Sequence, residues 1–288
     1  MALTIISDPR CTAYSAPGHP ERPARISATV DFLKAQGELP LDWSPPAEAG
    51  EAALLRAHTR EHLKRLEEPR DFDTDTPTYP DIAAHARRAV GGALQALAAA
   101  RAGQAALSVM RPPGHHATPD RAMGFCYLNS VAIAALEAQA GGCRRVAVLD
   151  FDVHHCNGTE EILLDKPGMM VISIHQYPAF PGTGLTNRGS NCFNFPAAPG
   201  TSREDFRHIL SSALAELRNF KPDMIAVSAG FDAYRGDPLA SEPMEAEDFQ
   251  WLGKMIRGME TPAFSVLEGG YSAELPQLIL AYLRGLHG

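Results

Sequence analysis

The segment Val146-Ala-Val-Leu-Asp-Phe-Asp-Val-His-His155 is the clearest indication of the fold class and contains the first candidate functional residues. Its first four residues are apolar, which predicts a buried strand, and polar residues follow without a spacer. From Asp150 to His154 polar and apolar residues alternate, so an extended backbone would turn three polar side chains to one side. Two carboxylates and an imidazole suit a divalent metal ion, although the same run also fits strand-end residues that cap a helix or pair with arginines.

The pattern of a short apolar run followed by polar or glycine-rich residues occurs five times in the chain. The predicted strands cover residues 105–110, 146–149, 170–174, 224–227 and 263–267. Predicted helices alternate with them at 81–102, 129–140, 201–218 and 245–259. This alternation predicts an α/β fold with a mostly parallel sheet sandwiched by helices, in which ligands bind beyond the carboxyl ends of the strands.

The segments between these elements predict loops and no domain boundary. Residues 39–50 are rich in proline, and residues 67–80 contain five acidic residues and three prolines, so both are predicted to be long loops. Thr201 and Glu204 have the spacing of a capping box, which predicts where the helix at 201–218 begins. No repeat or linker divides the chain, and we expect a single domain over residues 1–288.

The composition argues against several classes of function. With a formal net charge of −8, the 288-residue chain lacks the basic balance of a nucleic-acid-binding protein, and we expect no nucleic-acid partner. Its five cysteines are scattered and form no CxxC pair, so neither a disulfide framework nor a thiolate zinc site is predicted. No stretch has the pattern of a signal peptide or a membrane span, and we expect a cytoplasmic protein without a membrane partner.

Four further polar residues follow predicted strands. His115 and His116 come after a proline-rich turn, and adjacent imidazoles can act as general base and acid, although two neighbouring loop histidines are more often surface residues. Asp232 would supply a third metal ligand or simply cap a helix. Tyr271 follows two glycines that permit a sharp turn toward a pocket, where the phenol would donate to an oxyanion; the alternative is a core aromatic residue.

Considered together, these segments resemble the zinc-dependent histone deacetylase superfamily, most closely its class II branch and bacterial relatives. The resemblance begins at His19-Pro-Glu-Arg-Pro23 and covers nearly the whole chain. It is carried by Arg111-Pro-Pro-Gly-His-His-Ala117, Gly124-Phe-Cys-Tyr-Leu-Asn129, Asp150-Phe-Asp-Val-His-His155 with Asn157-Gly158, Phe180-Pro-Gly-Thr-Gly184, Ser228-Ala-Gly-Phe-Asp232 with Gly236-Asp-Pro238, and Leu267-Glu-Gly-Gly-Tyr271. It implies a single-domain arginase/deacetylase-like fold and zinc-dependent hydrolysis of an N-acyl amide by metal-activated water, with acetyl as the expected acyl group.

The resemblance assigns roles to the polar residues at the strand ends. One zinc ion per chain is expected on Asp152, His154 and Asp232, with a position left open for water and the substrate carbonyl. His116 is expected to shuttle the proton, and His115 to be its electrostatic partner. Tyr271 matches the tyrosine that polarises the scissile carbonyl.

The resemblance also implies supporting residues behind the histidines. Asp150 is expected behind His115, and Asn157 behind His116, where class I members place an aspartate. A neutral amide orients the imidazole but raises its pKa less than a carboxylate would. A structural potassium ion (K⁺) is implied as well, held by side chains and backbone carbonyls of Asp150, Asp152, His154, Ser173 and Ile174.

The pocket residues follow from the same resemblance. Phe125 and Phe180 are expected to form the walls of a tunnel for an aliphatic chain, with the Gly124 carbonyl at its base; two core phenylalanines are the alternative. Arg25 resembles an interior arginine near a cavity that releases acetate. The implied substrate is an acylated lysine in a peptide or protein, or a small acetylated amine.

One residue and one loop bear on that choice of substrate, and other residues bear on rival functions. Polyamine-selective relatives carry a glutamate gatekeeper where this chain has Leu239, which favours acyl-lysine, whereas the acidic loop at 71–75 would attract a polycation such as an acetylated polyamine. A binuclear manganese ureohydrolase needs a second metal-binding aspartate, but after Asp232 the chain reads Ala233-Tyr-Arg235. A non-catalytic acyl-lysine binder would have lost a metal ligand or the tyrosine, and all are present.

Overall fold

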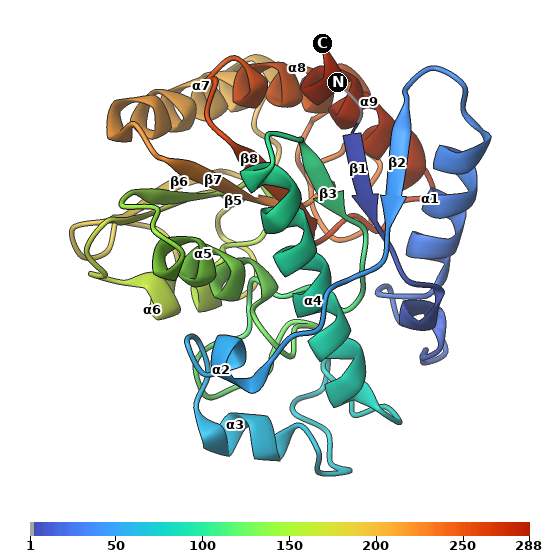
Figure 1. The fold of residues 1–288 in the computed structure, drawn as a ribbon. Helices are drawn as coiled ribbons and strands as arrows, with labels where there is room; N and C mark the ends of the chain where they lie inside the picture. Colours follow the sequence, from blue (N-terminus) through green and yellow to red (C-terminus); the bar gives the residue numbers. More distant parts are fainter. Residues whose placement is uncertain (1–2) are drawn as a thin grey trace.

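An all-parallel sheet of eight strands forms the centre of the computed structural model, which describes residues 3–288 (Figure 1). The strands lie in the order β2-β1-β3-β8-β7-β4-β5-β6. Their bounds are β1 Leu3–Ile6, β2 Leu41–Ser44, β3 Ala106–Ser108, β4 Val146–Asp150, β5 Met169–Gln176, β6 Cys192–Ala197, β7 Met224–Ala229 and β8 Ala263–Leu267. The fold is therefore a single α/β domain, as predicted, with every strand parallel to its neighbours.

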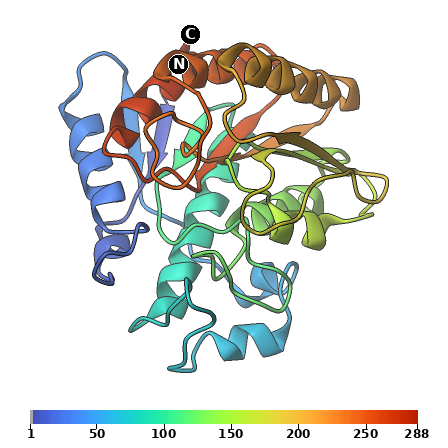
Figure 2. The same ribbon diagram turned by 180° about the vertical axis from the view of Figure 1, so that it is seen from behind.

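Helices lie on both sides of the sheet, as Figures 1 and 2 show from opposite directions. One side carries α1 Ala24–Ala35, α7 Arg203–Phe220, α8 Ala246–Arg257 and α9 Leu275–His287. The other carries α2 Glu51–Leu54, α3 Arg60–Arg65, α4 Ile82–Arg101, α5 Ser130–Ala140 and α6 Asn157–Leu163. In β4, Ala147 and Leu149 belong to the first core and Val146 and Val148 to the second. Burial on both faces explains why the predicted strands are continuous apolar runs.

The longest helix of the described chain is α4, with 20 residues. Small side chains, mainly alanine, make up most of its buried face, which lets it approach the sheet and α5 closely. Across residues 3–288, no helix is both long enough and apolar enough to cross a membrane.

The structure corrects the sequence-based prediction at three strands and at the start of one helix. Strands β1, β2 and β6 were not predicted, and β2 lies inside the predicted loop at 39–50 as a partly exposed edge strand. The predicted capping box at Thr201 and Glu204 is wrong, because Ser202 is the N-cap and accepts from the Asp205 N–H. The Thr201 hydroxyl instead donates to the Ala198 carbonyl at 2.6 Å and is not available to cap the helix.

All five predicted strands are present, and their carboxyl ends meet at one edge of the sheet. The segments that leave this edge carry the polar motifs: residues 111–129 after β3, 151–156 after β4, 230–245 after β7 and 268–274 after β8. Residues 67–80 form a loop, as predicted, that reaches the same edge. The functional side chains are therefore gathered at the place where parallel α/β sheets bind ligands.

Candidate active site

Asp152, His154 and Asp232 converge just beyond the ends of β4 and β7. One ligand atom of each lies within 4.8 Å of the other two. His154 Nδ1 is 3.1 Å from Asp152 Oδ1 and 3.2 Å from Asp232 Oδ2. Both carboxylates are fully buried. Three potential metal ligands therefore lie together in a buried position at the carboxyl edge of the sheet.

Backbone amides hold the remaining carboxylate oxygens in place. The Gly269 N–H donates to Asp152 Oδ2 at 2.7 Å, and the Val153 N–H donates to Asp232 Oδ1 at 2.8 Å. A Cβ atom at Gly269 would collide with both carboxylates, so only glycine permits this approach. Each carboxylate therefore turns its other oxygen toward His154.

The charges at this point favour a divalent cation. Burial disfavours a charged His154, but its hydrogen bonds to Asp152 and Asp232 outweigh that effect and raise its pKa to about 10. Burial and the nearby charge of Asp152 raise the pKa of Asp232 to about 7. Both shifts arise from two carboxylates crowded into a dry site, and a divalent ion would neutralise them. Two oxygen donors and one imidazole nitrogen match the three protein ligands of a catalytic zinc site.

The segment that carries these ligands is not an extended strand, contrary to the prediction. Strand β4 ends at Asp150, and residues 152–154 form bends. Asp150 Oδ1 accepts from the Asp152 N–H at 3.1 Å, and Asp152 Oδ1 accepts from the His154 N–H at 2.9 Å. These side-chain-to-backbone hydrogen bonds replace the ladder of the strand and still bring Asp152 and His154 together, while Asp150 points away to His115.

The two neighbouring histidines lie beside the ligand cluster with separate partners. His115 Nδ1 is 3.2 Å from Asp150 Oδ2, and His116 Nδ1 donates to Asn157 Oδ1 at 2.8 Å. Their ring centroids are 3.9 Å apart. Because Asn157 Oδ1 can only accept, the proton of the neutral His116 ring lies on Nδ1. Its Nε2 then has a free lone pair and can act as a base.

Their surroundings separate the pKa values of the two histidines. Burial opposes a charged His115, but the carboxylates of Asp152 and Asp150 prevail and raise its pKa to about 10. Burial, together with His115 and His154, lowers the pKa of His116 well below its usual value. A neutral His116 beside a charged His115 fits a proton acceptor with an electrostatic partner.

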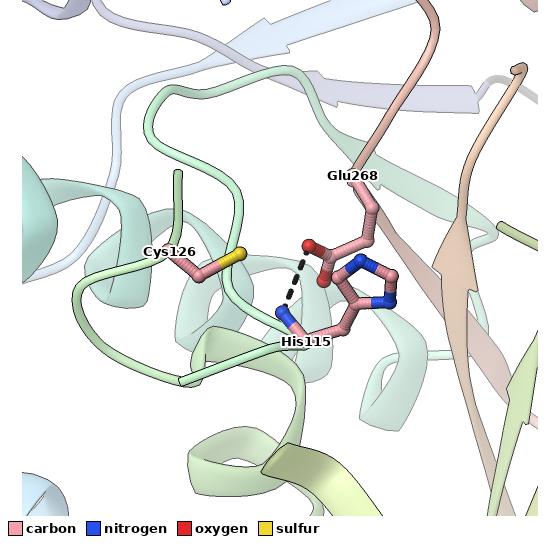
Figure 3. Close-up of side chains that lie close together, drawn as sticks. All are labelled: His115, Cys126 and Glu268. Atoms are coloured by element: carbon pink, nitrogen blue, oxygen red, sulfur yellow. Dashed lines mark hydrogen bonds between the residues drawn. The ribbon is translucent and has the colours of Figure 1, made fainter. Parts of the chain in front are cut away.

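Glu268 fixes the turn that carries these histidines, as Figure 3 shows. Its Oε2 accepts from the Gly114 N–H at 2.6 Å and from the His115 N–H at 3.1 Å. Glu268, His115 and Cys126 also lie close enough together to resemble a metal site. Their polar atoms already have protein partners, since Glu268 Oε1 accepts from Ser228 and Cys126 Sγ donates to the Gly124 carbonyl, so we regard this cluster as structural.

A narrow cavity of about 210 Å³ lies above the ligand cluster. It is lined by Asp75, His116, Gly124, Phe125, His154, Phe180, Leu239 and Tyr271. The Phe180 ring stands edge-on to His116 with centroids 5.0 Å apart, and the Phe125 ring stands edge-on to Tyr271 at 5.9 Å. Gly124 has a φ of +57°, and a Cβ there would press on His116 and Phe180, so only glycine keeps this passage open.

Tyr271 is held from both sides. Its N–H donates to Asp237 Oδ2 at 2.6 Å, and the Arg25 guanidinium lies 4.8 Å from its ring centroid. Burial raises the pKa of Tyr271 well above its usual value, so the phenol stays protonated and able to donate. Arg25 itself donates to the carbonyls of Gly270 and Glu268, beneath the cavity.

The structure thus brings together most of the residues that the sequence singled out. His116, Gly124, Phe125, His154, Phe180, Leu239 and Tyr271 line the cavity. Asp152 and Asp232 do not line it but contact His154, and we call these three residues the floor of the site. For the predicted potassium site, Asp150 and Ser173 are paired in the register of β4 and β5, and Ile174 follows on β5. The supporting roles of Glu268 and Asp237 were missed, because hydrogen bonds between distant segments leave no local pattern.

Comparison with known proteins places this geometry in a family. The model of the histone deacetylase domain family matches residues 19–286. A probable deacetylase of Methanothermobacter thermautotrophicus is 40% identical over 302 residues, which cover 99% of this chain and 91% of that protein. The crystal structure of the HD domain of HDA15 superposes with a TM-score of 0.92 at 31% identity, covering 98% of this chain and 88% of that one.

A second solved structure bears on the range of substrates within the family. The acetylpolyamine aminohydrolase from Burkholderia pseudomallei matches with a TM-score of 0.91 at 29% identity and covers 100% of this chain and 99% of its own. A protein named for an acetylated polyamine substrate therefore shares this fold. The chain belongs to the histone deacetylase domain family and is a deacetylase or amidohydrolase of that family.

Proposed function

We propose that this protein hydrolyses the acetyl amide of an acylated lysine in a peptide or protein, with one zinc ion per chain. The observation that carries the proposal is the convergence of Asp152, His154 and Asp232 at the floor of a narrow cavity. When bound there, zinc supplies Lewis-acid polarisation of the scissile carbonyl and of the attacking water.

The side chains around the floor would carry the remaining steps. His116 Nε2 takes the proton from the attacking water and later delivers it to the leaving amine, while Asn157 holds the ring in the required orientation. His115 stays charged between its carboxylates and steadies the negative charge that develops. Tyr271 donates its phenol proton in a hydrogen bond to the oxyanion as it forms.

The cavity would select the shape of the substrate. Phe125 and Phe180 form apolar walls that suit an unbranched aliphatic chain, and they exclude water from the reacting amide. The Gly124 carbonyl would accept from the N–H of the amide or amine at the base. Arg25, beneath Tyr271, would attract the acetate product.

We also propose a structural K⁺ behind the floor. Asp150 and Ser173 are opposite each other on β4 and β5, and both are fully buried. With Asp152, the carbonyl oxygens of His154 and Ile174 would complete an oxygen-rich set. Oxygen donors of this kind suit a hard cation. Its role would be to hold the loop after β4 and thereby the metal ligands.

An acetylated polyamine is the second candidate substrate, and Asp75 at the mouth of the cavity favours it. A carboxylate there would attract a second cationic amine, with the acidic residues of the loop 71–75 adding to the field. Leu239, apolar and 38% exposed at the same mouth, favours the neutral surroundings of a peptide. With its net charge of −8 the protein is proposed to act without a nucleic-acid partner, in the cytoplasm.

A substrate panel on zinc-loaded enzyme tests the proposal. Acetyl-lysine peptides, longer acyl-lysine peptides and acetylated polyamines are compared by kcat/KM at one ionic strength. The expected order places acetyl-lysine peptides first. A higher kcat/KM for acetylated polyamines would transfer the assignment to the second candidate, and hydrolysis of none of them would refute both.

A further inference from the structure

His19 lies outside the cavity but contacts two segments that shape its entrance. The residue belongs to the turn 16–22 before α1 and is partly exposed. Its Nε2 is 3.3 Å from the carbonyl oxygen of Asp75, and its Nδ1 is 3.1 Å from the N–H of Glu21. Its ring stands edge-on to Phe125 with centroids 4.7 Å apart.

Contacts at both ring nitrogens fix the orientation of the ring. Nε2 faces the Asp75 carbonyl and can donate to it, whereas Nδ1 lies 3.1 Å from both the N–H and the carbonyl oxygen of Glu21. The imidazole therefore uses both of its nitrogens in this arrangement. His19 therefore connects its own turn to the loop 67–80 in one defined geometry.

Phe125, the cavity wall against which His19 packs, depends on the same loop. Its backbone has a φ of +69°, an uncommon value for a residue with a side chain. Its N–H donates to Thr76 Oγ1 at 3.2 Å, and Thr76 is fully buried. The position of this aromatic wall is thus set by Thr76 through the backbone and by His19 through the ring.

The turn that carries His19 is firmly anchored to the floor of the site. Glu21 forms buried ion pairs with Arg25 and Arg111, which are 5% and 0% exposed. Arg25 in turn donates to the Gly270 carbonyl, next to Tyr271. His19 therefore resists a displacement of the loop 67–80 relative to the floor.

We infer that His19 is a positioning residue for substrate capture, which holds the Phe125 wall and the Asp75 loop at a fixed distance from the floor. It touches neither the reacting atoms nor the metal ligands. Its loss would let the entrance widen, which lowers substrate affinity while the chemical step is preserved. The kinetic test of this inference rests on the proposed function, whereas the contacts of His19 do not.

Four substitutions separate the contributions of the ring and its two hydrogen bonds. His19→Ala removes all contacts, and His19→Phe keeps the ring contact alone. His19→Asn retains an acceptor for the Glu21 N–H but is too short to reach Asp75, whereas His19→Gln extends an amide donor to the Asp75 carbonyl. His208→Ala, an exposed histidine on α7, is the matched control.

The kinetic readout is kcat and KM on one acetyl-lysine peptide, alongside the Kd of a linear hydroxamate. His19→Ala is expected to raise KM and Kd by about tenfold and to leave kcat within about twofold, since substrate binding and not transition-state stabilisation is lost. His19→Gln is expected to restore most of the affinity, and His19→Asn to behave like alanine. Equal kinetics in His19→Ala and His208→Ala, or a fall in kcat at constant KM, would overturn the inference.

Hydrogen–deuterium exchange provides a readout that does not depend on the reaction. In His19→Ala, amides of residues 71–80 and 122–128 are expected to exchange faster, while β4 and β7 are unchanged. Should the wild type hydrolyse no substrate, the proposed function fails but faster exchange at these two segments still supports the positioning role. Unchanged exchange there, with an unaltered melting temperature, refutes it.

Discussion

The floor and the rim of the cavity are built in opposite ways. At the floor, Asp152 and Asp232 are almost completely buried, and each carboxylate is held by a backbone N–H as well as by His154. At the rim, the large apolar residues Phe180 and Leu239 are 43% and 38% exposed. The floor contains buried charge with every orientation fixed, and the rim contains apolar surface in contact with water.

The contrast separates the part of the molecule that determines the reaction from the part that determines the substrate. Buried charges are tolerated only with good partners, so substitution of one ligand leaves the others uncompensated. Exposed apolar side chains have few partners and can be exchanged at little cost in stability. We therefore expect substitutions at the floor to abolish the chemistry, and substitutions at the rim to change selectivity.

The largest effect is expected from Asp232→Ala at the floor. Loss of this ligand should abolish zinc retention and lower kcat/KM by more than about 10³-fold, because metal activation of water is lost. Elemental analysis and steady-state kinetics on the same sample measure both. Full activity in Asp232→Ala or in metal-stripped wild type would contradict a metal-dependent floor, and two tightly bound transition metals would point to a binuclear site.

Tyr271→Phe tests whether the phenol acts in the transition state. It should lower kcat by about 10²-fold or more and leave substrate Kd nearly unchanged, because the hydrogen bond strengthens only as the oxyanion forms. Phenylalanine preserves the ring, so a packing role would leave turnover near normal. The melting temperature is the control for folding, and equal turnover in the two proteins would remove the role assigned to Tyr271.

Leu239→Glu should change selectivity without abolishing turnover. A carboxylate at the rim is expected to raise the ratio of kcat/KM for acetylated polyamine over acetyl-lysine peptide by about tenfold, and added salt should reduce this gain. Leu185→Glu is the matched control, because Leu185 is exposed but does not line the cavity. If both variants shift the ratio equally, the effect is one of net charge and not of the rim position.

The smallest effect is expected at Glu242, in the loop that carries Leu239. Its two carboxylate oxygens are buried without a hydrogen-bond partner among the described residues, and burial raises its pKa from 4.5 to about 8. Because the folded state binds this proton more tightly than the unfolded state, stability is lost as pH rises through about 8. Glu242→Gln should therefore melt a few degrees above wild type at about pH 9 and lose that advantage near pH 5.

Thermal unfolding followed across this pH range measures the difference between the two proteins. Glu245→Gln is a suitable comparison, since Glu245 is partly exposed and paired with Arg235. Parallel pH curves for wild type and Glu242→Gln would show that the buried carboxyl does not titrate differently on folding.

Local patterns in the sequence were sufficient for the central strands and most of the floor. A buried strand of a parallel sheet is apolar on both faces, so β4, β7 and β8 are visible as uninterrupted runs followed by polar residues. Strand β2 is not, because Leu41-Asp-Trp-Ser44 lies at the sheet edge and is only partly buried. Its hydrogen bonds to β1 cannot be inferred from its own composition.

The supporting contacts were beyond sequence reasoning for a different reason. Glu268 bonds to an amide 153 residues away in the chain, and Arg25 to a carbonyl 245 residues away. Periodicity and spacing report only on neighbours within a helix or strand, so such contacts depend on the completed fold. The resemblance to a known family supplied the ligand set, but not the backbone hydrogen bonds that orient it.

The position of β8 has a consequence for how the chain is made. This last strand lies between β3 and β7, and it alone joins the half-sheet β2-β1-β3 to the half-sheet β7-β4-β5-β6. Because residues 263–267 are synthesised after both half-sheets, the edges of β3 and β7 that pair with β8 stay unpaired until then. Unpaired edges of this kind recruit other strands, so the nascent chain is exposed to aggregation until the segment that also delivers Tyr271 has been translated.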